Sequence, residues 1–276
     1  EIIGRLNSGI APLFEPGLDD LIKCGISSNN LRFSVVDEAS FIDSDVVWVT
    51  YDTPVDDDDQ ADIEFVIKKV MHILPFLSKD TVVLVSSQLP VGSVGRLEKY
   101  ANDNYPLLQL KFACSPENLR LGQAIKVFSD PDRVIIGVRS DATKTPLLEL
   151  FRPITDKIEW MSIESAEMTK HAINAFLATS ITFTNELASI CEQVGANAKE
   201  VERGLKTEVR IGPKAYVSPG GPFAGGTLAR DIGFLCAIAS DRDLITPIIS
   251  SVRVSNDEHK NWARKKLIQH FGSLRN

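Results

Sequence analysis

The chain has 276 residues, which is enough for one large domain or two modest ones with an ample core. Its 43% hydrophobic and 24% charged residues are typical of a soluble globular protein, and its net charge of −7 argues against a nucleic-acid-binding surface. No apolar run approaches the ~20 residues needed to cross a bilayer, and the first residues carry no secretory signal. We therefore expect a cytoplasmic protein without a membrane partner.

Four cysteines are scattered without C-x-x-C spacing, so the sequence suggests neither a disulfide framework nor a metal site. Cys191 and Cys236 lie within apolar helical patterns and are interpreted as buried thiols. The acidic run Asp56–Asp59 is interpreted as a solvated loop in preference to a metal site, because adjacent carboxylates repel one another and point apart.

Strand-like and helix-like segments alternate as far as residue 161, which is the pattern of an α/β protein with a doubly wound sheet. Several strand candidates are continuous β-branched runs, as expected for parallel strands covered on both faces. The clearest helical pattern is Ala61–Leu77. The strand candidates are Phe33–Val36, Val46–Thr50, Val82–Ser86, Leu108–Ala113, Arg133–Val138 and a short one at Lys157–Trp160.

A long helix is predicted from Ile163 to Val194, where the sequence has neither glycine nor proline. Ser162 can cap its start, Glu164 is favourably placed in its first turn, and Gly195 is a natural stop. Such a helix suits a spine between two domains, residues 1–161 and 162–276, and a dimer surface. Its apolar face is assigned to Ile173, Phe176, Leu177, Ile181, Leu187 and Cys191, and further helical patterns follow at Ala198–Leu205, Asp231–Ser240 and Thr246–Leu267.

The segment Ser218–Asp231, S-P-G-G-P-F-A-G-G-T-L-A-R-D, is the most informative motif of the chain. It resembles the active-site loop of the UDP-glucose/GDP-mannose dehydrogenase family, in which a glycine-rich turn presents a catalytic cysteine followed four residues later by an aspartate. Here Asp231 is present, but Thr227 stands where the cysteine belongs. Further stretches that fit the family are Leu6–Gly9, Glu15–Leu18, Asp52–Pro54, Ser115–Gly122, Pro131–Arg133 and Glu167–Ala175.

The resemblance implies an NAD-dependent oxidation of the C6 alcohol of a nucleotide sugar to a carboxylate, for polysaccharide or glycoconjugate precursors. In that reaction the cysteine thiolate attacks the intermediate aldehyde, and the thiohemiacetal is oxidised to a thioester that is then hydrolysed. A threonine hydroxyl is far harder to ionise than a thiol. The resemblance also implies an incomplete Rossmann-type sheet followed by the long helix and an α-helical dimerisation domain.

Residue roles follow from the same resemblance. Lys170 and Asn174, one helical turn apart, would bind the substrate oxygen and stabilise its charge. Asp231 would organise a water, and Glu117 would assist hydrolysis of the thioester. Without the resemblance, Lys170 reads as a snorkelling lysine at the edge of an apolar stripe.

The remaining assignments concern the cofactor and the substrate. Thr53 would lie near NAD, and Gln88 replaces an active-site threonine of the family. Arg210 would reach across the dimer interface to the substrate diphosphate, although by itself it reads as a solvated arginine. Phe223 and the backbone of Ala224, Gly225 and Gly226 would line the sugar pocket.

No G-x-G-x-x-G occurs in the chain. In the family that turn cradles the pyrophosphate of the dinucleotide. We therefore expect a fragment that begins after this unit and ends before the family's C-terminal nucleotide-binding domain, and that binds NAD poorly.

Other functions stay open on the sequence. Loss of the cysteine fits a divergent member that performs a single oxidation or a redox-neutral reaction such as epimerisation, since neither needs a thiolate. A non-catalytic, dimerising scaffold is a further alternative. The short hydroxyacid dehydrogenases share the cofactor domain, the long helix and a lysine–asparagine pair, but they do not explain the glycine loop that ends in Asp231 or the segment around Arg210.

Overall fold

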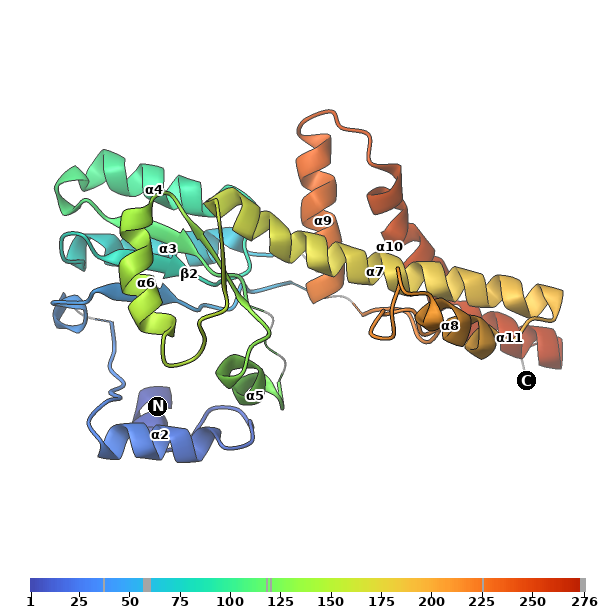
Figure 1. Cartoon of the computed structure of the whole chain (residues 1–276), viewed down its shortest axis with the longest axis horizontal. Coiled ribbons are helices and arrows are strands. Elements are labelled where there is room, and N and C mark those ends of the chain that lie inside the picture. Colours follow the sequence, from blue (N-terminus) through green and yellow to red (C-terminus); the bar gives the residue numbers. More distant parts are fainter. Residues whose placement is uncertain (37, 57–60, 118, 120, 225, 274–276) are drawn as a thin grey trace. The chain divides into compact units, whose positions relative to one another are not determined.

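The computed structural model describes residues 1–36, 38–56, 61–117, 119, 121–224 and 226–273 (Figure 1). Contacts between residues divide the chain into two compact units. Unit 1 comprises residues 1–54 and 62–168, and unit 2 comprises residues 55–61 and 169–276. The main boundary, between Met168 and Thr169, therefore lies inside the long helix.

Unit 1 contains a five-stranded sheet with helices between its strands. The strands are β1 (Val46–Val49), β2 (Val82–Val85), β3 (Lys111–Cys114), β4 (Val134–Val138) and β5 (Ile158–Met161). The helices are α1 (Ile2–Asn7), α2 (Leu18–Ser27), α3 (Ile63–Ile73), α4 (Ser93–Asn104), α5 (Ala124–Ser129) and α6 (Lys144–Phe151), with 3-10 turns η1 (Glu38–Phe41), η2 (Leu74–Phe76), η3 (Pro106–Leu108) and η4 (Asp141–Thr143). The alternation predicted from the sequence is thereby confirmed.

The strands lie in the sheet in chain order, but they do not all run the same way. β1, β2 and β3 are parallel, as are β4 and β5, whereas β3 and β4 are antiparallel with Cys114 opposite Gly137. Parallel pairing, expected for the β-branched runs, is therefore found at three of the four strand pairs, and β3 with β4 is the exception. Among the described residues between these two strands, α5 is the one α-helix, and its six residues span about 9 Å, which is too short to cross back over the sheet.

The strand predicted at Phe33–Val36 is not formed. Both backbone groups of Phe33 bond to a side chain instead: Asn7 Nδ2 donates to the Phe33 carbonyl at 3.0 Å, and the Phe33 N–H donates to Asn7 Oδ1 at 3.3 Å. A β-rich sequence becomes a strand only when a neighbouring strand pairs with it. Here an asparagine amide takes the place of that neighbour.

Both faces of the sheet are covered, as the run of four buried residues in β2 requires. On one face Val83 and Val85 pack with residues of α3 and α4, and on the other face Val82 and Leu84 pack with residues of α6 (Figure 1). The start of α7 (Ile163–Val194) packs directly on β4, because a Cβ at Gly137 would stand 2.7 Å from Ile163 Cα. Only glycine permits this approach.

The long helix α7 begins and ends where the sequence predicts. Ser162 Oγ accepts the N–H of Ser165 at 3.2 Å, so the predicted N-terminal cap is confirmed. Gly195 follows the last helical residue with a φ of 77°, the left-handed conformation that closes a helix. At 32 residues, α7 is about 48 Å long.

The other helices of unit 2 are α8 (Ala198–Thr207), α9 (Thr227–Ser240), α10 (Pro247–Lys260) and α11 (Trp262–Phe271). Two predictions are corrected here. α9 begins four residues before Asp231, and the single helix predicted over Thr246–Leu267 is interrupted at Asn261, where the backbone has φ −85° and ψ −4°. Ala175 and Ala178 of α7 pack in one apolar cluster with Phe223, Ile232 of α9 and Val252 of α10.

Within unit 2, the buried side of α7 is largely small and polar. Ala175 and Ala178 are buried there together with His171, Asn174, Thr182, Thr184, Asn185 and Cys191. Phe176, assigned to the apolar face on the sequence, is instead 70% exposed. Small residues such as Ala175 and Ala178 let the neighbouring helices approach α7 closely. The large side chain of Phe176 lies on another side of α7.

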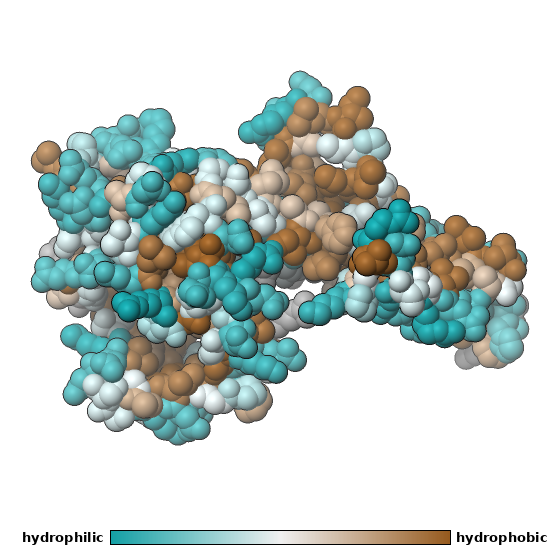
Figure 2. Space-filling view, in the orientation of Figure 1, coloured by the Kyte–Doolittle hydropathy of each residue, from teal (hydrophilic) through white to brown (hydrophobic). Residues whose placement is uncertain are grey.

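Large hydrophobic side chains gather on the surface of unit 2. Figure 2 shows them over the α9–α10 hairpin, where Leu244, Ile245 and Ile248 are exposed. All four cysteines are free, and Cys114 and Cys191 are buried while Cys236 is half-buried. Across the described part of the chain, no helix is long and apolar enough to span a membrane.

Candidate functional site

In unit 1, the candidate cofactor residues lie just beyond the carboxyl ends of β1 and β2. Thr53 follows β1 and is buried, and its Oγ1 donates a 2.7 Å hydrogen bond to the carbonyl oxygen of Gln88, which follows β2. The two residues named from the sequence are therefore in contact. Carboxyl ends of parallel strands in a doubly wound sheet are where dinucleotides bind.

A chain of hydrogen bonds joins the ends of three strands beside this pair. Trp48 Nε1 donates to Ser86 Oγ at 2.8 Å, and Ser86 Oγ donates to the carbonyl oxygen of Ser115 at 2.6 Å. The Trp48 ring also packs against Phe151 with ring centroids 5.3 Å apart. These contacts fix where the chain leaves each strand, and so where the residues that follow are placed.

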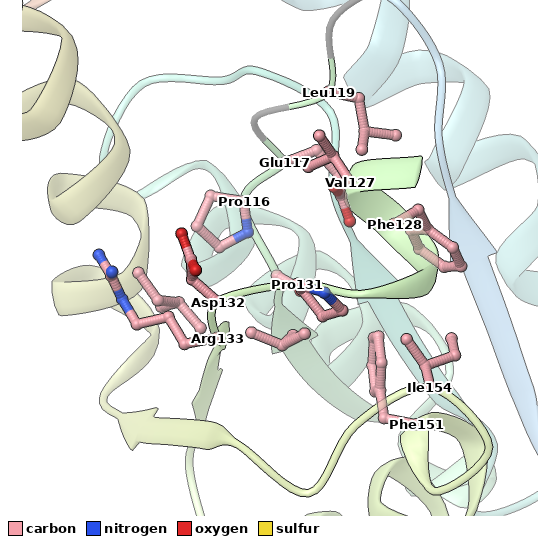
Figure 3. Close-up of a pocket in the computed structure, with 13 residues that line it drawn as sticks. Pro116, Glu117, Leu119, Val127, Phe128, Pro131, Asp132, Arg133, Phe151 and Ile154 are labelled. Carbon is pink, nitrogen blue, oxygen red and sulfur yellow. The ribbon is translucent and has the colours of Figure 1, made fainter. Parts of the chain in front are cut away.

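Glu117 lines a cavity of about 190 Å³ (Figure 3). It comes from the loop after β3, while Phe128 of α5 and Phe151 of α6 supply apolar walls and Arg133 precedes β4. The antiparallel step from β3 to β4 places both chain segments at one edge of the sheet. The result is a small, mixed apolar and charged pocket around one of the predicted catalytic residues.

Two buried glutamates that sequence reasoning did not assign hold this edge of unit 1 in place. Glu15 accepts the backbone N–H groups of Gly122, in the loop beyond Glu117, and of Ile125, in the first turn of α5. Glu167 accepts those of Gly92 and Val94, at 2.7 and 2.9 Å, at the start of α4. Carboxylates are the favoured partners of unpaired N–H groups at a helix start. Both glutamates lie in stretches that fit the family, Glu15–Leu18 and Glu167–Ala175, and this position in the sequence could have indicated them.

The residues present fit one part of a dinucleotide site. Thr53 and Gln88 lie at the carboxyl ends of β1 and β2, whereas the N–H groups of Gly92 and Val94 at the start of α4 donate to Glu167. The pyrophosphate-binding turn G-x-G-x-x-G does not occur in the sequence. Thr53 and Gln88 are the residues at this edge that could contact a dinucleotide.

In unit 2, a buried polar cluster joins α7 to α9. Asp231 of α9 is fully buried, and its Oδ1 lies 2.7 Å from Nδ1 of His171 on α7. Asn174 Nδ2 of α7 donates to the other oxygen, Oδ2. The structure thus brings together Asn174 and Asp231, two residues named from the sequence, around a histidine that was not named.

Lys170 is half-buried and lies one turn before Asn174 on α7. An ammonium and an amide at this spacing can act on one substrate oxygen. His171 lies three residues before Asn174 and hence on the same side of the helix. This spacing was the signal that could have identified His171 in the sequence.

The glycine loop that precedes α9 is held by side chains from two other helices. Asn256 of α10 makes two 2.9 Å hydrogen bonds with the backbone of Phe223, accepting its N–H and donating to its carbonyl oxygen. Asn185 of α7 accepts the N–H of Gly220 at 2.9 Å. His259 Nε2 lies 2.9 Å from the Gly220 carbonyl oxygen. The loop backbone is therefore positioned by amides that no sequence motif revealed.

Thr227 is the first residue of α9 and is exposed. Gly226 before it has φ 66° and ψ −121°, a conformation that favours glycine. A helix start lowers the pKa of a thiol enough to ionise it, but a hydroxyl starts from a far higher pKa. Cys236, further along α9, is nine residues or about 13.5 Å away, and burial raises its pKa. It does not replace the missing thiol.

The predicted substrate residues of unit 2 have different settings. Phe223 is buried in the apolar cluster of α7, α9 and α10. Arg210 lies after α8 with its side chain 84% exposed, and its Nε donates to Glu208 Oε1 at 2.9 Å. Gly225 lies outside the described residues. The unit therefore does not bring Arg210 into the buried cluster.

Among the residues whose positions are given, no cluster of histidine, cysteine, aspartate or glutamate could hold a metal ion. The acidic run interpreted as a solvated loop falls mostly at residues 57–60, which lie outside the described part of the chain.

Two family models match the chain in succession. Residues 1–155 match the NAD binding domain of the UDP-glucose/GDP-mannose dehydrogenase family, and residues 164–258 match its central domain. The protein is thus an α/β protein with a dinucleotide-binding domain of Rossmann type followed by helices. The chain belongs to the UDP-glucose/GDP-mannose dehydrogenase family, and the cofactor to which its first domain corresponds is NAD.

Individual relatives agree with this assignment. A UDP-glucose 6-dehydrogenase of Rhizobium meliloti is 34% identical over 98% of this chain and 63% of the relative, and UDP-glucose 6-dehydrogenase YwqF of Bacillus subtilis is 32% identical over 99% and 62%. The solved structure of a UDP-glucose dehydrogenase from Pyrobaculum islandicum superposes with a TM-score of 0.89 at 26% identity, covering 100% of this chain and 64% of that one. The chain therefore spans less than two thirds of the length of these relatives.

Proposed function

We propose that the protein oxidises the C6 alcohol of a nucleotide-bound sugar, with NAD as hydride acceptor, in the cytoplasm and for polysaccharide or glycoconjugate precursors. The observation that carries this proposal is the buried contact between Asn174 and Asp231, because it joins two polar residues that the chemistry requires. UDP-glucose is the first substrate to test, since it is the one in the names of the relatives.

Different residues of unit 2 have different roles in the oxidation of the C6 alcohol. The Lys170 ammonium and the Asn174 amide stabilise negative charge on the C6 oxygen as its proton leaves. Asp231, held by Asn174 and His171, orients the water that accepts this proton. The chemistry that bound NAD would supply is that of a hydride acceptor for the substrate carbon. Thr53 and Gln88 contribute to its binding in unit 1.

The family's second oxidation needs a nucleophile at the start of α9, and this supports a narrower alternative. Thr227 has no ionisable thiol, and Gln88 replaces a further active-site hydroxyl. We infer that the protein stops at the aldehyde or catalyses a redox-neutral change such as epimerisation. Glu117, which would assist thioester hydrolysis, would then have no thioester to act on. A scaffold that binds nucleotide sugars without turnover is the non-catalytic alternative.

A panel of nucleotide sugars distinguishes these functions. The protein that carries this sequence is incubated with NAD and UDP-glucose, GDP-mannose or a UDP-N-acetylhexosamine, and both NADH and products are measured. A carboxylate supports the full reaction, and an aldehyde or epimer supports the alternative. Binding without any product supports the scaffold. Neither binding nor NADH with any sugar would refute the proposed substrate class.

Thr227→Cys sharpens the choice, with Thr227→Ser as its matched control. If the missing thiol limits the second oxidation, the cysteine variant forms at least ~10-fold more carboxylate, while the serine variant stays at the level of the unchanged protein. Equal carboxylate from all three forms would mean that residue 227 does not limit the reaction.

A homodimer through α7 is part of the proposal. Phe176, Phe183 and Ile190 follow one another at seven-residue spacing and are 70%, 53% and 58% exposed. Such spacing keeps side chains on one stripe of a helix, which suits a second copy of the chain. Arg210, exposed and able to exchange Glu208 for a diphosphate, would act across this interface, and Phe223 and Gly226 would shape the sugar pocket.

The dimer is tested by the mass in solution. Phe183→Asp places a charge in the stripe and is expected to give monomers in light scattering, whereas Phe183→Leu keeps the apolar contact and the dimer. Unchanged mass in the aspartate variant would place the interface elsewhere.

A further inference from the structure

His171 is the one residue of the buried α7–α9 cluster that the proposed chemistry does not use directly. Its side chain is 1% exposed, and its Nδ1 lies 2.7 Å from Asp231 Oδ1. Histidine is seldom fully buried without a specific partner. Here the partner is the carboxylate of Asp231, which orients the water in the proposed reaction.

The geometry determines which ring nitrogen carries the proton. An ionised carboxylate has only acceptor sites, so the short contact requires that His171 Nδ1 donates its N–H to Asp231 Oδ1. Asn174 Nδ2 donates to Oδ2. With one donor on each oxygen, the carboxylate group of Asp231 can neither rotate nor shift without breaking a hydrogen bond.

The imidazole ring is itself held in place. It meets the ring of Phe234, on α9, edge to face, with centroids 5.4 Å apart and an interplanar angle of 81°. Phe234 lies three residues after Asp231 on the same helix. Helix α9 therefore supplies both the Asp231 carboxylate and the aromatic ring that orients the His171 imidazole. The orientation of Nδ1 toward Oδ1 is therefore built into the packing of α7 against α9.

We propose that His171 is a positioning residue for Asp231, acting through its Nδ1–H. It keeps the carboxylate in the orientation in which Asp231 can hold the water that takes the C6 hydroxyl proton. The inference rests on the proposed function for its catalytic consequence, but the hydrogen bond and the tautomer can be measured without any substrate.

The first experiment reads the tautomer by ¹⁵N NMR of the histidine-labelled protein. The chain has four histidines, and His171→Asn identifies the signals of His171 by their loss. We expect Nδ1 of His171 to resonate as a protonated nitrogen coupled to its own hydrogen, with slow exchange against solvent. A bare Nδ1, or one whose proton exchanges as fast as that of His270, which is exposed, would overturn the proposal.

The second experiment compares two amide variants by steady-state kinetics with NAD and the sugar found active. The amide of asparagine falls near the place of Nδ1 and that of glutamine near Nε2, so His171→Asn retains the donor to Asp231 and His171→Gln removes it. We expect kcat to stay within about threefold in the asparagine variant and to fall at least ~10-fold in the glutamine variant, with KM little changed in both. His270→Asn serves as the control.

The outcomes distinguish the positioning role of His171 from the proposed function of the protein. Equal loss in both amide variants, or a loss that appears in KM alone, would overturn the positioning role. An inactive parent protein with a protonated, slowly exchanging Nδ1 would refute the proposed function and leave the His171–Asp231 contact standing. A protonated Nδ1 with full activity in His171→Gln would refute the positioning role alone.

Discussion

The two units of the chain have interiors of different kinds. In unit 1 many of the most deeply buried residues are large and apolar, such as Leu84, Leu97 and Phe112. In unit 2 several of the most deeply buried residues are polar, notably His171, Asn185, Asp231 and Asn256. Apolar burial stabilises in proportion to area and tolerates exchange, whereas a buried polar group must keep its partner. Unit 1 therefore relies mainly on large apolar side chains, with Glu15 and Glu167 fixing the backbone at its edge, whereas unit 2 relies more on matched polar pairs that also position its glycine loop.

The largest expected effect comes from conservative exchanges in the two interiors. Asp231→Asn places an amide where His171 or Asn174 presents a donor, so we expect the free energy of unfolding to fall by about 2–4 kcal/mol. Leu97→Met in unit 1 keeps the volume and is expected to lose less than about 1.5 kcal/mol. Urea unfolding of both variants measures the difference. Equal losses would mean that the two interiors do not differ in tolerance.

In the packing of unit 1, Gly137 is a position where a larger residue would meet backbone atoms. Its Cβ in Gly137→Ala would lie 2.7 Å from Ile163 Cα and 2.8 Å from the Ser162 carbonyl oxygen, and backbone atoms cannot give way as a flexible side chain can. We expect a loss of about 1–3 kcal/mol in thermal unfolding. Gly95→Ala, whose nearest neighbour is the Arg139 side chain at 3.5 Å, is the matched control and should be neutral or stabilising. A harmless Gly137→Ala would show that α7 can move away from β4.

The hydrogen bonds of Asn256 and Asn185 to the glycine loop predict that each substitution affects hydrogen exchange locally in that loop. Asn256→Ala leaves the N–H and carbonyl oxygen of Phe223 without their partner, and we expect about 1–2 kcal/mol less protection, or ~10-fold faster hydrogen exchange, at the Phe223 amide. Asn185→Ala should act on the Gly220 amide instead. The two variants control each other, and uniform acceleration at both amides in either variant would contradict separate anchors.

The smallest effect concerns a surface contact of the same loop. Glu202 accepts hydrogen bonds from Lys206 and Ser218, and these lower its pKa from 4.5 to about 2. Because the folded-state pKa is depressed, this contribution is fully present above pH 4.5 and is lost as the pH falls from 4.5 toward 2. Carboxyl NMR should give a Glu202 midpoint near 2. An unshifted midpoint would contradict the contacts with Lys206 and Ser218.

The sequence predicts what depends on local pattern and misses what depends on distant partners. The α7 boundaries and the buried β2 run are set by the local sequence, and both predictions are confirmed. Phe33–Val36 has strand composition, but its pairing depends on Asn7, far away in the chain. The direction of β4 likewise depends on its pairing with β3, which periodicity does not reveal.

The site was predictable to the same extent. The resemblance named Asn174 and Asp231, and the fold places them in contact. His171 could have been found from its spacing to Asn174 on α7. Asn256 could not, because its partner Phe223 lies 33 residues away and an asparagine in an amphipathic helix reads as an ordinary surface residue.

The contact between Thr53 and Gln88 has a consequence for how the family can diversify. Thr53 bonds to the carbonyl oxygen of residue 88, which every amino acid possesses. Position 88 can therefore mutate while this hydrogen bond between the segments that follow β1 and β2 is kept. A framework of this kind lets evolution explore reactions at one position while the scaffold stays intact.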